Sequence, residues 1–223
     1  MKILFLLLFV INLKALQSKT IEQPNKEIMH QQNILDLVEK NDIEAVKRSL
    51  DNGANVNTQD RNKRSLLLIA TINQQVEMAK LLVAHGANVN LQDDKMDSPF
   101  LYAGASGQTE LVKLFLANGA RFDIFNRYNG TALIPACERG HVETVKVLVY
   151  TKDFPINHVN RLGWTALLEA VILGNGGKDH QEIVQILKDG GADLNIPDHD
   201  GITALQHAKS RGFKEIEKIL ESK

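Results

Sequence analysis

Apolar and polar residues follow one another in blocks that repeat from about residue 33 to the C-terminus. In each block a Ser or Thr precedes a short apolar run, with an Ala five residues after the hydroxyl residue. A glycine such as Gly107 then interrupts the run, and a second segment such as 110–116 carries apolar residues at helical spacing. The pattern predicts pairs of short helices, the first of each pair opened by a hydroxyl cap. These hydroxyl residues are Ser65, Ser98, Thr131, Thr165 and Thr203.

A five-residue motif marks the end of each second helix. Residues 53–57 read G-A-N-V-N, and related motifs follow at 86–90, 119–123 and 191–195, with a degraded copy at 153–157. The first two steps are 33 residues long. Glycine at this place supplies the left-handed residue that ends a helix. A fixed period of this length indicates a repeat protein, in which each helix pair is buried by its neighbours.

Taken together, these residues resemble the ankyrin repeat, a β-turn finger followed by two antiparallel helices. The resemblance implies an all-α solenoid of about six helix-turn-helix units. The stretch 162–177 also resembles a bacterial subgroup with an insertion in its penultimate repeat. Three glycines in four residues predict a mobile loop at 175–179. The domain at 32–223 is expected to comprise an N-terminal cap (32–58), four repeats (59–91, 92–124, 125–158, 159–196) and a C-terminal cap (197–223).

The N-terminus differs from the rest of the chain. An apolar run from Ile3 to Leu13 follows Lys2 and is too short to span a membrane, which predicts a signal peptide over residues 1–18. Residues 19–31 are polar and predict a flexible lead-in. We therefore expect an exported protein, periplasmic or alternatively secreted, with no membrane attachment after cleavage. Cleavage would remove two lysines and no acid, so the formal charge would change from −1 to −3.

Composition narrows the chemistry further. The 26 basic and 27 acidic residues are interspersed, and the expected finger tips carry no continuous basic stripe, which argues against nucleic acid. The lone Cys137 excludes an intramolecular disulfide and follows the small residue of a first helix, where a buried inert thiol is expected.

Catalytic and cofactor motifs are incomplete. Residues 174–178 resemble a phosphate loop but lack its first glycine and its hydroxyl residue. Residues 198–201 resemble the start of a calcium loop, yet Lys209 occupies the place of the terminal Glu, so a finger turn is the better interpretation. A stack of repeats is also expected to lack a deep pocket lined by acids and bases. The sequence thus predicts no enzyme, no cofactor and no metal site.

A binding surface is expected on the concave side, formed by finger tips and first helices. Trp164, just before a hydroxyl cap, is either an interface hot spot or a brace against the neighbouring finger. Mixed charge at the finger tips suits a protein partner. The predicted protein-binding residues are Arg64, Tyr102, Arg127, Tyr128, Arg139, Arg161, Leu162, Trp164 and Glu169.

The leading hypothesis is therefore a monomeric exported adaptor that binds a protein partner of unknown identity. Two alternatives stay open at this point. One is an immunity or inhibitor protein that blocks a toxic enzyme, and the other is an effector secreted into host cells.

Overall fold

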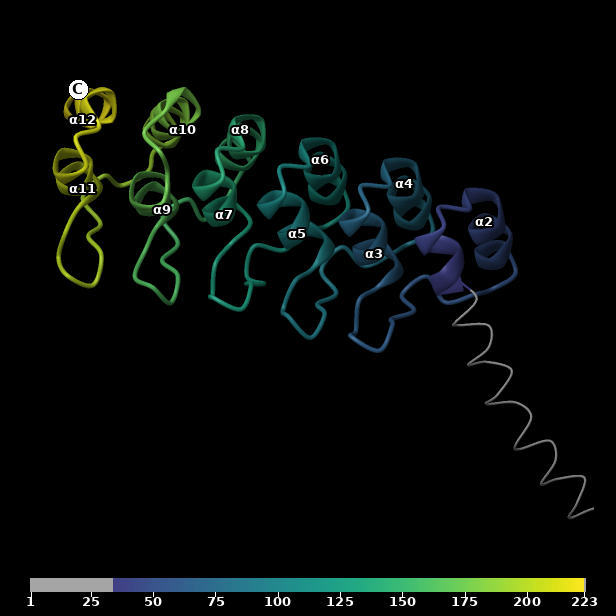
Figure 1. Cartoon of the computed structure of the whole chain (residues 1–223). Helices are drawn as coiled ribbons and strands as arrows, with labels where there is room; N and C mark the ends of the chain where they lie inside the picture. Colours follow the sequence, from purple (N-terminus) through teal and green to yellow (C-terminus); the bar gives the residue numbers. More distant parts are fainter. Residues whose placement is uncertain (1–33, 223) are drawn as a thin grey trace, which may run out of the picture.

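A computed structural model describes residues 34–222, which form a single row of helix pairs with finger loops projecting to one side (Figure 1). The expected all-α repeat solenoid is confirmed. The predicted signal peptide (1–18) and the whole predicted lead-in (19–31) lie outside the described residues. No helix in the described part is long and apolar enough to cross a membrane.

The row of repeats consists of helix pairs. The pairs are residues 34–39 with α2 (Ile43–Asp51), α3 (Leu66–Ile72) with α4 (Val76–Ala84), α5 (Pro99–Ala105) with α6 (Thr109–Ala117), α7 (Leu133–Glu138) with α8 (Val142–Val149), α9 (Ala166–Ile172) with α10 (Lys178–Asp189), and α11 (Ala204–Ser210) with α12 (Lys214–Glu221).

Hydroxyl side chains begin four of the five first helices for which the sequence predicts such a cap. Ser65, Ser98, Thr165 and Thr203 each accept a hydrogen bond from the backbone N–H three residues later. Each bond satisfies one of the backbone donors that an α-helix leaves unpaired at its start.

Thr131 does not cap its helix, and the prediction for this position is wrong. The helix α7 begins only at Leu133, after Ala132 as the cap residue. Pro135 explains the delay, because it has no N–H to donate to the Thr131 carbonyl, whereas the carbonyls of Ser65, Ser98, Thr165 and Thr203 each accept such a bond. The buried Thr131 hydroxyl has no hydrogen-bond partner among the described residues.

Left-handed residues end the second helices, as the five-residue motif predicts. Gly53, Gly86, Gly119 and Gly191 have φ between +82° and +90°. No atom lies close to the place of a Cβ at these glycines, so the backbone conformation alone accounts for the residue type. In the degraded copy, Asp153 has a φ of +60° but lies four residues after the end of α8 at Val149, where each glycine lies two residues after its helix.

Each finger is a β-turn held by an Asp or Asn side chain at its base. Asp198, for example, accepts hydrogen bonds from the N–H groups of Asp200 and Ile202, and Gly201 has a φ of +77°. The interpretation of 198–201 as a finger turn is therefore confirmed. The equivalent residues in the other fingers are Asp60, Asp93, Asn126 and Asn160.

The repeats are joined by a continuous apolar core and by side chains that reach the preceding repeat. The core extends from Ile34 to Leu220. At the end of α3, Gln108 of the next repeat donates to the Thr71 carbonyl at 3.0 Å. At the end of α7, the His180 Nε2 lies 2.9 Å from the Glu138 carbonyl. Carbonyls that would be unpaired at these helix ends are thereby satisfied.

The insertion at 175–179 is packed, so the prediction of a mobile loop is wrong. The Asn175 side chain accepts from the Gly177 N–H at 2.8 Å and lies 3.1 Å from His180 Nδ1. Gly176 has a φ of +70°, and a Cβ there would come within 2.6 Å of the Phe213 ring. Gly176 therefore permits a close approach to the last repeat.

Candidate protein-binding site

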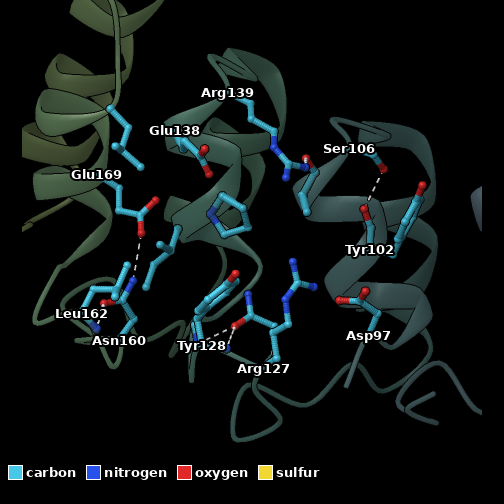
Figure 2. A pocket seen from close by; sticks show the side chains of 16 residues that line it. Asp97, Tyr102, Ser106, Arg127, Tyr128, Glu138, Arg139, Asn160, Leu162 and Glu169 are labelled. Atoms are coloured by element: carbon cyan, nitrogen blue, oxygen red, sulfur yellow. Dashed lines mark hydrogen bonds between the residues drawn. The ribbon is translucent and has the colours of Figure 1, made fainter. Parts of the chain in front are cut away.

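A cavity of about 530 Å³ lies on the side of the first helices and fingers, between α5, α7, α9 and the loops before them (Figure 2). The sequence did not predict this cavity. Gly130, Ala105 and Pro135 line it, and these small or compact residues leave space where longer side chains would fill it. The charged residues of its wall are Asp97, Arg127, Glu138, Arg139 and Glu169.

Six of the nine predicted binding residues meet at this cavity. They come from three successive repeats, and two of them are exposed at its edge, Tyr128 at 49% and Leu162 at 45% of their surface. The predicted residues that line the cavity are Tyr102, Arg127, Tyr128, Arg139, Leu162 and Glu169.

The other three predicted residues do not line the cavity. Arg64 pairs with Asp60 of its own finger at 2.6 Å. Arg161 is exposed and donates to the Arg127 carbonyl at 3.2 Å. Trp164 is half-buried and packs against the apolar core, which favours its interpretation as a brace.

Glu169 is the most buried acid of the cavity, with 6% of its surface exposed. Asn160 Nδ2 donates to its Oε1 at 2.9 Å. Burial, followed by the nearby charge of Glu138, raises the pKa of Glu169 to about 7, although the Asn160 hydrogen bond and Arg139 act in the opposite direction. A carboxyl group that changes charge near neutral pH therefore borders the cavity.

Two basic side chains occupy the part of the cavity nearer α5. The Arg127 guanidinium lies 4.8 Å from the centre of the Tyr128 ring. Arg139 donates from Nη1 to the Ala105 carbonyl at 2.6 Å. Across from them, burial raises the pKa of Asp97. The cavity thus has an acidic end near α9 and a mixed end with both arginines.

Glu138 and Asn160 were not predicted to belong to the site. Counted from the hydroxyl residue of each repeat, Glu169 is at position 4, Glu138 at position 7 and Arg139 at position 8. Positions three or four apart lie on the same face of a helix, and equivalent first helices stack side by side. Positions 4, 7 and 8 could therefore have been predicted to lie on one surface. Asn160 holds its finger through its side-chain oxygen and contacts Glu169 through its nitrogen, a double role that the finger motif alone does not reveal.

The described residues contain no group of three or more His, Cys, Asp or Glu side chains placed to hold a metal ion. Cys137 is fully buried, and burial raises the pKa of its thiol well above the usual value, as expected for an inert packed residue.

Comparison with known proteins decides the family. The family model for ankyrin repeats (3 copies) matches residues 34–126 and 100–198. The chain belongs to the ankyrin repeat family. It is 36% identical to the Escherichia coli K12 ankyrin repeat protein YahD over 182 residues, which cover 82% of this chain and 90% of YahD.

Two solved ankyrin repeat structures are similar to the whole stack. The crystal structure of an ankyrin repeat domain from Acinetobacter baumannii AYE has a TM-score of 0.82 and 46% identity, covering 84% of this chain and 95% of that one. That of the ankyrin repeat protein EF0377 has a TM-score of 0.81 and 41% identity, with the same coverage. Ankyrin repeats are generally protein-protein interaction modules and are typically non-catalytic.

Proposed function

We propose that this ankyrin repeat protein is an exported, non-catalytic monomer that binds a protein partner through the cavity and the surrounding concave face. The cavity carries this proposal, because its polar walls come from three successive repeats and its edge exposes large apolar side chains. Tyr128, Leu162 and Leu173 are exposed between 45% and 49%. Aromatic and apolar side chains around fixed polar groups are the chemistry of interface hot spots.

A site-specific photo-crosslinker tests the binding face in the native organism. The crosslinking amino acid would replace Leu162 at the edge of the cavity, or Lys113, an exposed residue of the second helix α6, as a control. We expect a discrete crosslinked protein from position 162 and none from position 113. Equal crosslinking at both positions, or none at either, would contradict binding through the cavity.

Export is proposed from the sequence of the N-terminus, and it needs its own experiment. A C-terminally tagged full-length protein should be recovered outside the cytoplasm in a form shortened by about 18 residues. Replacement of Leu6 and Leu7 by Asp, which interrupts the apolar run, should retain the full-length protein in the cytoplasm. Full-length wild-type protein in the cytosol would refute export.

A further inference from the structure

The acidic end of the cavity is formed by two carboxylates from successive repeats. Figure 2 shows Glu138 of α7 and Glu169 of α9 on facing walls. Glu169 is 94% buried, and Asn160 engages only its Oε1. Its second oxygen is directed toward the cavity and accepts no hydrogen bond from the described residues. This oxygen faces the cavity, where a donor of a bound molecule could reach it.

No base of the described chain pairs with these acids. Neither Glu138 nor Glu169 is among the described ion pairs formed within 4.0 Å. Arg139 turns toward α5, where it binds the Ala105 carbonyl. Arg211, from the other side, donates to the carbonyls of Ile172 and Gly174. Both arginines donate to backbone carbonyls, and neither forms an ion pair with the two acids.

We propose that this end of the cavity receives a Lys or Arg side chain of the bound protein, an inference that rests on the proposed function. Leu162, Leu173 and Ile134 line the same end and would cover the aliphatic stem, while the charged group lies between the two carboxylates. An acidic or phosphorylated side chain would be repelled there. A neutral donor could satisfy one oxygen but would leave the repulsion between the two acids in place.

The charges around Glu169 agree with this choice of ligand. Among them, Glu138 affects the pKa of Glu169 more strongly than Arg139 does, so the local field favours a cation. Binding of a cation favours the ionised carboxylate, and affinity should therefore rise with pH across neutrality. Three helices pack against α9, and their titratable and charged residues all enter the account of the local charge. They are Cys137 and Glu138 on α7 with Arg139 directly after it, Lys178, Asp179, His180, Glu182, Lys188 and Asp189 on α10, and His207 and Lys209 on α11 with Arg211 directly after it. His207 is paired with Asp198, and His180 with Asn175 and the Glu138 carbonyl.

Short peptides test the ligand chemistry directly. The probes are acetyl-Gly-X-Gly-amide with X as Lys, Arg, norleucine or Glu, titrated into the mature protein and followed by amide chemical shifts of Leu162 and Leu173. We expect the Lys or Arg peptide to bind at least tenfold more tightly than the norleucine peptide, and the Glu peptide not to bind. Equal binding of the Lys, Arg and norleucine peptides would overturn the proposal.

Charge variants identify the residue. Glu169→Gln keeps the acceptor for Asn160 and should weaken Lys or Arg binding at least tenfold, whereas Glu143→Gln, an exposed acid of α8, should have no effect. With a pKa of about 7, wild-type affinity should rise about tenfold from pH 6 to pH 8, and Glu169→Gln should abolish that rise. Wild-type affinity and pH dependence in the Glu169→Gln variant would exclude this site.

The proposed protein binding and the proposed cation site can be disproved independently. If the crosslinker at position 162 captures the same partner equally well in wild type and in Glu169→Gln, the cation site is wrong and the binding function stands. If the basic peptides bind as expected but no protein is captured at position 162, the cation site stands and protein binding is wrong.

Discussion

At the scale of single residues, Glu169 couples the candidate site to the stability of the fold. Its folded pKa of about 7 lies above the ordinary value of 4.5, because burial disfavours the charged form. A group with a raised pKa stabilises the fold fully below its unfolded pKa and loses that contribution as pH rises through the folded value. Ionised Glu169 is the form that would bind a cation, and its ionisation lowers the free energy of unfolding as pH rises through about 7.

Glu169→Gln should remove this cost. We expect the unfolding free energy of wild type to fall relative to the variant by about 2–3 kcal/mol between pH 4.5 and pH 8, as the carboxyl ionises. Urea unfolding of both proteins across this range measures the difference, in which the other titrating groups cancel. Parallel curves would show that Glu169 is not buried as described.

Trp164 offers a second test at this scale. It is half-buried against the core and lies outside the cavity lining, so Trp164→Ala should lower the unfolding free energy by about 2 kcal/mol. The exposed neighbour Leu162 is the control, and Leu162→Ala should change stability by less than about 0.5 kcal/mol. Partner affinity per folded molecule should be unchanged in Trp164→Ala. A large loss of affinity with normal stability would restore the hot-spot interpretation.

At the scale of helices and loops, the insertion before α10 acts as a link between repeats. Gly176→Ala should cost about 1 kcal/mol for its positive φ and a further 1–3 kcal/mol for overlap with Phe213. Gly201→Ala is the matched control, since Gly201 also has a positive φ but no atom within 4 Å of a Cβ. Thermal unfolding of the two variants compares them. Equal losses would mean that the insertion does not pack on α12's repeat.

Most elements could be predicted from sequence because their signals are local. Ser65 or Thr165 and the five-residue motif each act through hydrogen bonds and φ values within a few residues. The prediction that Thr131 caps a helix was wrong because Pro135, four residues later, lacks the N–H that would donate to the Thr131 carbonyl. This effect becomes visible only when each i→i−4 hydrogen bond of the helix is considered in turn. The prediction of a mobile insertion was wrong for another reason. Its glycines indicate flexibility when read alone, whereas hydrogen bonds of Asn175 and the contact of Gly176 with Phe213, about 37 residues later in the chain, hold the insertion in place.

The candidate site was only partly predictable for the same reason. Tyr128 and Leu162 follow from their places on the fingers, and six predicted residues do meet at the cavity. The cavity exists because Gly130 has no side chain and Ala105 has only a methyl group. The burial of Glu169 depends on the packing of three repeats. Such properties belong to neighbouring repeats together, so no single motif encodes them.

At the scale of the whole molecule, side-chain amides at the motif ends join successive repeats with one interruption. Asn57 accepts from the Asn88 N–H at 2.8 Å, and Asn90 accepts from the Arg121 N–H at 2.9 Å. The next step would join Asp123 to Pro155, which has no N–H, and Asp123 instead pairs with Arg121. The ring centres of Phe122 and Phe154 lie 4.9 Å apart at this junction and supply an apolar contact there.

This interruption predicts different costs for equivalent substitutions. Asn90→Ala should lower the unfolding free energy by about 1 kcal/mol, or the Tm by about 2–4 °C, because Arg121 loses the acceptor for its N–H and Asn90 no longer donates to the Gly119 carbonyl at 2.8 Å. Asp123→Ala should leave stability nearly unchanged, since its pair with Arg121 is exposed on both sides and spans no repeat junction. Calorimetry of the two variants measures both effects. Because stability in a repeat stack is the sum of the repeats and their junctions, equal losses would mean that hydrogen bonding at the motif ends contributes nothing to coupling between repeats.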